Sequence, residues 1–133
     1  MNKINRNSRL FFFQFIFQRD YSDESNLDGF ISSNLKKKPF NKKKLKQLYE
    51  SYSNNLDLIK KACKESDSEK YNKVSTYLLY SFFSEYLLSP NLKKVLINEY
   101  IDISKDFLTK QEVSFFNHLI DKIVKKYLEK KLK

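Results

Sequence analysis

The sequence predicts an all-α fold, a compact single-domain helical bundle of about six to seven helices over residues 1–133. The chain contains only one glycine and two prolines, which disfavours a turn-rich β protein and favours long helices. In most segments apolar residues recur every three or four positions, the spacing of one helix face. A chain of this length buries enough surface to fold without disulfides or metals. We therefore expect one helical domain.

The chain begins with a basic, polar segment followed by an apolar run, Leu10–Phe17. This order imitates a signal peptide, but the run is much shorter than the ~20 apolar residues that cross a bilayer. Gln18, Arg19 and Asp20 also follow where a cleavage site needs small residues. We therefore expect a buried first helix and a cytoplasmic protein without a membrane partner.

Two amphipathic segments follow. Four apolar residues predict a short second helix: Leu27, Phe30, Ile31 and Leu35. A lysine-rich break, Lys36–Lys44, follows, and we expect it to be a solvated loop. Beyond it, apolar residues spaced three and four positions apart predict a single continuous helix, the third of the chain. These residues are Leu45, Leu48, Tyr52, Leu56 and Ile59.

The segment from about Asp67 to Leu88 differs from the others because apolar residues surround it almost completely. They are Tyr77, Leu78, Leu79, Tyr80, Phe82, Phe83, Tyr86 and Leu87. A helix that is apolar all round is buried on every side, so this segment predicts the central helix. Ser66 and Glu69 fit a capping box at its start. Ser89–Pro90 is expected to close it and to open the next helix.

The last third of the chain predicts a helical hairpin. One apolar stripe consists of Leu92, Leu96, Tyr100, Ile103 and Phe107. Thr109 and Glu112 then fit a capping box that starts the final helix. The stripe of that helix consists of Val113, Phe116, Ile120, Ile123 and Tyr127. Two amphipathic helices with a tight joint form a hairpin, which we expect to pack against the central helix.

Charge and composition narrow the function. The net charge of +10 suggests an acidic partner such as nucleic acid. An AT-rich genome would also raise the lysine content, but all three arginines lie within the first 19 residues. No glycine-rich loop and no spacing of a nucleophile with a histidine is present. Cys63 and His118 alone make neither a disulfide nor a zinc site. We expect no enzyme, no cofactor and no metal.

Basic and aromatic residues provide the candidate binding site. Lys3, Arg6 and Arg9 precede the first apolar run, and Phe107 and Phe115 flank the joint of the hairpin. Arginine forks to phosphate or stacks on bases, and proteins that read single-stranded RNA stack its bases on aromatic rings. Phe115 lies off the apolar stripe, so we expect it to face outward. This pattern predicts single-stranded RNA as the partner.

The hairpin also resembles the signature of the NusB family, roughly V-x-I-N-E, then A-K-x-F, then F-x-N-G-x-L-D. The matching residues, in register without a gap, are Val95, Leu96, Ile97, Asn98, Glu99, Lys105, Phe107, Phe115, Asn117 and Asp121. The N-terminal pattern R-x-x-x-x-Q-x-L-Y resembles Arg9, Gln14, Ile16 and Phe17, and Glu85 resembles the glutamate of the family's Y-E-L.

The resemblance implies a small all-helical transcription antitermination factor that binds boxA-type RNA of ribosomal RNA operons together with the ribosomal protein NusE. It implies an RNA path along Arg6, Arg9, Phe107 and Phe115, to which Lys3, Lys110 and Gln111 are added by position. The implied NusE face contains Gln14, Phe17 and Glu85. Four signature residues are expected to be structural and buried: Asn98, Glu99, Asn117 and Asp121. Other Nus factors and RNA polymerase are wider candidate partners, and a homodimer is a further candidate state.

Departures from the family pattern put partner affinity in question more than the fold. Phe17 stands where the family often has tyrosine, Tyr100 replaces a small residue, and Leu108 and His118 replace glycines at the joint. Two alternatives stay open. One is a non-catalytic helical interaction protein that dimerises over its N-terminal face. The other is the RNA-binding module of a ribosomal RNA methyltransferase, which the absence of a catalytic domain in this sequence disfavours.

Overall fold

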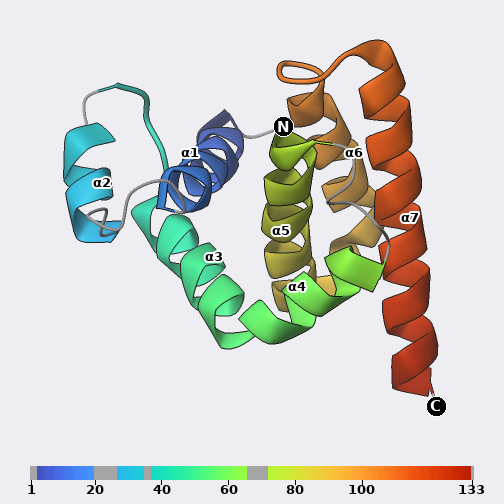
Figure 1. Cartoon of the computed structure of the whole chain (residues 1–133). Helices are drawn as coiled ribbons and strands as arrows, with labels where there is room; N and C mark the ends of the chain where they lie inside the picture. The colour runs from blue at the N-terminus through green and yellow to red at the C-terminus, as the bar shows by residue number, and fades with distance from the viewer. Residues whose placement is uncertain (1–2, 20–26, 35–36, 66–71, 133) are drawn as a thin grey trace.

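Helix α5 occupies the centre of the computed structural model, which describes residues 3–19, 27–34, 37–65 and 72–132. On one side of α5 lie the helices α1, α2 and α3 (Figure 1). The opposite side is covered by α6 and α7, and α4 lies at one end of α5. The helices are α1 (Lys3–Arg19), α2 (Leu27–Asn34), α3 (Lys42–Asn54), α4 (Leu56–Glu65), α5 (Lys73–Leu88), α6 (Lys93–Ser104) and α7 (Lys110–Leu132), with a short 3-10 helix η2 (Pro90–Leu92). The described residues contain no strand, which confirms the all-α prediction.

The composition of α5 explains its central position. Every residue from Ser75 to Tyr86 is buried, and α5 contacts α1, α3, α4, α6 and α7. Each fully buried large apolar side chain contributes about 1.5–3 kcal/mol, so a helix apolar on all sides gains most where others surround it. The predicted central helix is confirmed from Lys73 onward; its predicted first turns and the capping box at Ser66 and Glu69 lie outside the described residues.

The prediction of one continuous third helix is wrong, because the chain breaks at Asn55 into α3 and α4 (Figure 1). The backbone N–H and the side-chain amide of Asn55 both donate to the Ser51 carbonyl, at 3.0 and 2.8 Å. A side chain that bonds the local backbone competes with helix continuation. Leu48 and Ile59, on either side of the break, are both fully buried, so the apolar spacing did not reveal it.

The lysine-rich break is shorter than predicted. Asn41 caps α3 by accepting a hydrogen bond from the Lys44 backbone N–H at 3.0 Å, as asparagine does at helix starts. Lys42 and Lys43 are therefore exposed residues of the first helical turn, and Lys44 is partly buried.

The predicted hairpin is confirmed, with an earlier end to its first helix. Leu96, Tyr100 and Ile103 of α6 are buried, whereas Leu92 and Phe107 are exposed by 46% and 41%. Helix α6 ends at Ser104, so Phe107 lies in the joint. The capping box is present: the Thr109 N–H donates to Glu112 at 2.9 Å, and the Glu112 N–H donates to the Thr109 hydroxyl at 3.2 Å.

Aromatic side chains join α1 to the rest of the core. Phe12 and Phe15 are almost fully buried, and Phe15 contacts Phe30 of α2 and Tyr49 of α3 edge to face. The expected buried first helix is therefore confirmed. None of the described helices is long and apolar enough to cross a membrane.

Candidate nucleic-acid interface

The first turns of α1 lie beside the end of α6. Arg6 donates a hydrogen bond to Asp102 and forms a 3.6 Å ion pair with Asp106. The hydrogen bond raises the pKa of the Arg6 guanidinium and lowers the pKa of Asp102. The Arg6 side chain is 27% exposed and both carboxylates are more than half exposed. Water therefore screens these pairs, and an external anion can replace them.

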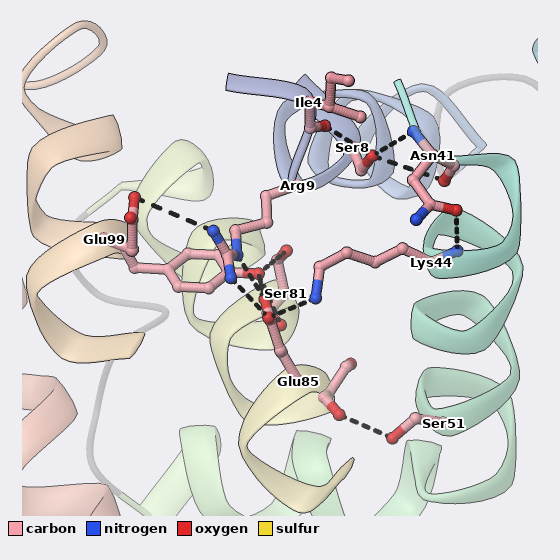
Figure 2. A network of polar contacts seen from close by, with 11 residues as sticks. Ile4, Ser8, Arg9, Asn41, Lys44, Ser51, Ser81, Glu85 and Glu99 are labelled. Atoms are coloured by element: carbon pink, nitrogen blue, oxygen red, sulfur yellow. Dashed lines mark hydrogen bonds and ion pairs between the residues drawn. The ribbon is translucent and has the colours of Figure 1, made fainter. Parts of the chain in front are cut away.

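One helical turn further along α1, Arg9 is buried in a polar network (Figure 2). Its Nε and Nη2 donate to the two carboxylate oxygens of Glu85, at 2.8 and 2.9 Å. Lys44 of α3 and the hydroxyl of Tyr100 on α6 also donate to Glu85, at 2.8 and 3.0 Å. The bidentate pair joins α1 to α5, and the hydrogen bonds from Lys44 and Tyr100 connect α3 and α6 to the same carboxylate.

Burial and charge act in opposite directions on this network. Burial alone would raise the pKa of Glu85, but the hydrogen bonds and charges of Arg9 and then Lys44 outweigh it and hold that pKa below its usual range. Burial, followed by the negative charge of Glu85, raises the pKa of Tyr100 well above its ordinary value. Glu85 is therefore the charged centre of the network and Tyr100 a neutral donor.

Glu99 completes the network from α6. Its Oε2 lies 3.9 Å from Nη1 of Arg9 and is a buried acceptor without a hydrogen bond. Arg9 thus sits between two buried carboxylates (Figure 2). The expectation that Arg9 and Glu85 lie on two separate binding faces is corrected, because they are buried against each other.

Most of the other candidate residues lie at the joint between α6 and α7. The exposed ring of Phe107 packs edge to face on Phe13 of α1, with centroids 5.3 Å apart, next to the Asp106 that pairs with Arg6. Lys110 and Gln111 are exposed on the first turn of α7, and Lys3 is exposed on α1. Arg6 and Phe107 therefore flank one junction between α1 and the joint.

Phe115 belongs to a different hollow and is partly buried, not outward as expected. It lines a cavity of about 260 Å³ together with Gln111, Asn72 and Ser75. This hollow lies between the start of α7 and the start of α5. The structure does not place Phe115 beside Arg6.

The residues expected on the partner face and in the structural signature are divided. Gln14 is exposed, and Phe17 is partly buried against Tyr77 with centroids 5.3 Å apart. Of the four signature residues only Glu99 is buried; Asn98, Asn117 and Asp121 are exposed, so their expected burial is wrong. No group of three or more His, Cys, Asp or Glu among the described residues is placed to hold a metal ion.

Sequence reasoning missed the partners of both arginines. Asp102 lies 96 residues from Arg6 and Glu85 lies 76 residues from Arg9, so no local spacing connects them. Lys44 was assigned to a solvated break. The one available signal was Asn41, whose capping preference would have placed Lys44 inside a helix.

Known proteins resemble this chain in part of its sequence and in its fold. No protein-family model matches the sequence. A 47-residue segment is 47% identical to the transcription antitermination protein NusB of Rickettsia bellii, covering 35% of this chain and 30% of the relative. A 35-residue segment is 49% identical to that of Rickettsia africae, covering 26% and 22%. The matched segments thus span less than a third of either relative.

The fold is similar to that of the solved structure of T. maritima NusB, with a TM-score of 0.76 and 22% sequence identity. The match covers 94% of this chain and 93% of the T. maritima chain. The chain therefore has the NusB fold over almost its whole length and resembles NusB proteins in sequence over about a third of it.

Proposed function

We propose that this chain is a transcription antitermination factor that binds boxA-type single-stranded RNA together with the ribosomal protein NusE during ribosomal RNA transcription, and that it acts by binding alone. The observation that carries this proposal is the junction of Arg6 and Phe107. At this junction the partly exposed guanidinium of Arg6 pairs with the exposed carboxylates of Asp102 and Asp106, and the exposed ring of Phe107 packs on Phe13 of the same helix α1. The similarity to NusB proteins in fold and in part of the sequence supports the same function.

The exchange of carboxylate for phosphate gives a physical mechanism. A phosphate of the RNA backbone would replace Asp102 and Asp106 on Arg6, and the loss of these pairs would cost little because exposed ion pairs contribute little stability. Lys3 and Lys110 are exposed and add positive charge. The exposed ring of Phe107 would stack on an unpaired base, as aromatic residues do in proteins that bind single strands. Arg9 would support this face by positioning α1 against α5 and α6.

The partner face would lie further along α1. Gln14 is exposed, and the ring of Phe17 is held in place by Tyr77 and by Phe13, whose centroid lies 6.0 Å away. The ring of Phe17 would offer an apolar contact to NusE, without the hydroxyl that a tyrosine at this position would add. Glu85 takes no part, because it is buried on Arg9.

The experiment is binding of purified protein to a boxA-like RNA and to a scrambled RNA, with and without NusE, at two salt concentrations. We expect a preference for boxA that NusE strengthens. R6Q should weaken RNA binding and reduce the salt slope by about 0.7, the share of one phosphate contact in single-stranded RNA. K125Q is the matched control, because Lys125 is an exposed residue of α7 that pairs with Asp121 at 3.0 Å.

Two outcomes would contradict this proposal. Equal, strongly salt-dependent binding to both RNAs would show a nonspecific basic protein. No RNA binding at all would favour the second candidate, a helical interaction protein.

One observation favours self-association, through residues that lie outside α1 and so not over the N-terminal face expected for the second candidate. Leu88, Leu92 and Val95, spaced four and three residues apart, are exposed by 49%, 46% and 53%. Leu88 ends α5, Leu92 ends η2 and Val95 lies in the first turn of α6, and exposed large apolar residues gain stability when a partner covers them. Light scattering over a range of concentrations tests it: a salt-insensitive dimer that L92S disrupts would support self-association, and a monomer throughout would argue against it.

A further inference from the structure

A second concave site lies where the last turn of α1 meets α3 and the start of α4. It is a cavity of about 350 Å³ whose walls include Arg19, Tyr49, Ser53 and Lys60. This volume lies within the range of small-molecule pockets in proteins. Arg19 lies about 20 Å from Arg6 along α1, at 1.5 Å per residue. The cavity is therefore separate from the proposed RNA face.

Among the described residues, no acid compensates the positive charge around this cavity. Arg19 and Lys60 are both exposed, and the described residues that line the cavity include no carboxylate. Neither cation forms an ion pair with a described acid. Arg6, by contrast, is paired twice. One N–H of Arg19 donates to the Tyr49 hydroxyl, which leaves further donors of the guanidinium for a ligand. Two cations that converge on one cavity favour an anion. Residues 20–26 lie outside the described part and are not included in this site.

The cavity also has an aromatic wall. The guanidinium carbon of Arg19 lies 5.4 Å from the ring centroid of Tyr49, and Phe15 holds that ring edge to face at 5.5 Å. A planar aromatic group gains stacking energy on tyrosine or on a guanidinium. Ser53 is exposed at the rim and offers a hydroxyl that both donates and accepts. Inorganic phosphate would use the cations but leave this wall uncovered.

We propose that this cavity binds a nucleotide, with its phosphate on Arg19 and Lys60 and its base against Tyr49. The nucleotide is either free or part of an RNA strand, since both carry the same chemistry. The proposal does not depend on the proposed function, because it uses none of the residues of the α1–α6 junction.

Titration of the full chain with AMP and with inorganic phosphate, followed by calorimetry and by NMR, tests this site. AMP should bind about fivefold or more tightly than phosphate, because stacking adds to the charge contacts. R19Q and K60Q should each weaken AMP binding about tenfold, as expected for loss of a charged hydrogen bond. Y49L should weaken AMP binding by a larger factor than phosphate binding, because AMP loses the stacking surface as well as the contact that positions Arg19. K61Q is the matched control, since Lys61 is the next residue on α4, is exposed, and lies outside the cavity.

Three results would overturn the proposal: no saturable binding of AMP at millimolar concentrations, phosphate binding as tightly as AMP, or an equal loss in K61Q. Binding of single-stranded RNA to R6Q and to the double variant R6Q/R19Q shows whether the nucleotide is free or part of an RNA strand. If R19Q weakens RNA binding further in R6Q, the nucleotide belongs to an RNA strand. If R19Q weakens AMP binding about tenfold and leaves RNA binding intact, the ligand is a free nucleotide. A failure of boxA binding with AMP binding retained would contradict only the proposed function.

Discussion

Arg6 and Arg9 lie one turn apart on α1 and pair with carboxylates of other helices, yet their surroundings differ. The Arg9 side chain is 9% exposed and its partner Glu85 is 4% exposed, whereas Asp102, the partner of Arg6, is 53% exposed. A buried pair is strongly coupled to folding, because removal of one partner leaves an uncompensated charge. An exposed pair is screened by water and exchanges easily. The comparison separates an arginine whose buried pairs hold helices together from one whose ion pairs are exposed to water.

The largest effect is expected from R9M. Without Arg9, the carboxylates of Glu85 and Glu99 remain buried near each other, and breaking a buried pair costs about 3–5 kcal/mol of unfolding free energy. Urea denaturation measures it. R6M is the matched control and should change stability far less, because water replaces its contacts. Equal losses in both variants would contradict the distinction between the two arginines.

The pH dependence of stability provides the second test. The pKa of Glu85 is lowered in the folded protein, so its contribution is fully present above the unfolded pKa of ~4.3. It is lost as the pH falls from there toward the lower folded pKa. E85Q lacks this contribution, so the difference in unfolding free energy between wild type and E85Q should narrow as the pH falls below ~4.3. A difference that is constant from pH 7 to pH 3 would show that folding does not lower the pKa of Glu85.

A smaller loss is expected from Y100F. The Tyr100 hydroxyl donates to Glu85 at 3.0 Å and lies 3.1 Å from the Ser81 hydroxyl. Its removal should cost about 1–2 kcal/mol, because Arg9 and Lys44 still satisfy the carboxylate. The same denaturation experiment measures it. A loss as large as that of R9M would contradict the view that Arg9 contributes more than Tyr100 to holding Glu85 in the fold.

The smallest effect concerns the exposed pair. D102N and D106N release Arg6 from intramolecular competition, so RNA binding should tighten by about two- to fivefold, in keeping with the weakness of exposed ion pairs. D121N is the control for the change in net charge, because Asp121 pairs with Lys125 on α7. Equal tightening in all three variants would show a general charge effect and no specific release of Arg6.

The secondary structure was largely predictable because its signals are local. The capping box of Thr109 and Glu112 spans four residues, and the apolar stripes of α6 and α7 repeat within single helices. The break at Asn55 escaped prediction, because the apolar spacing continues across it and one asparagine is a weak signal by itself.

The candidate site was only partly predictable. Lys3, Arg6, Phe107, Lys110 and Gln111 are at least partly exposed, as a binding face needs. Arg9 carried the same sequence signal as Arg6 and is buried, because α1 turns that position toward α5. Phe115 was assigned to the same site as Phe107 but lines a separate hollow with Asn72 and Ser75.

By itself, the sequence determined that the chain is helical, that α5 lies in the middle, and that the N-terminal segment is basic. These properties follow from residue spacing and composition within single segments. Only the tertiary structure decided which arginine is buried on Glu85 and which is held by Asp102. Those pairs join residues 76 and 96 positions apart, and whether a charge is structural or available depends on the helices that pack around it.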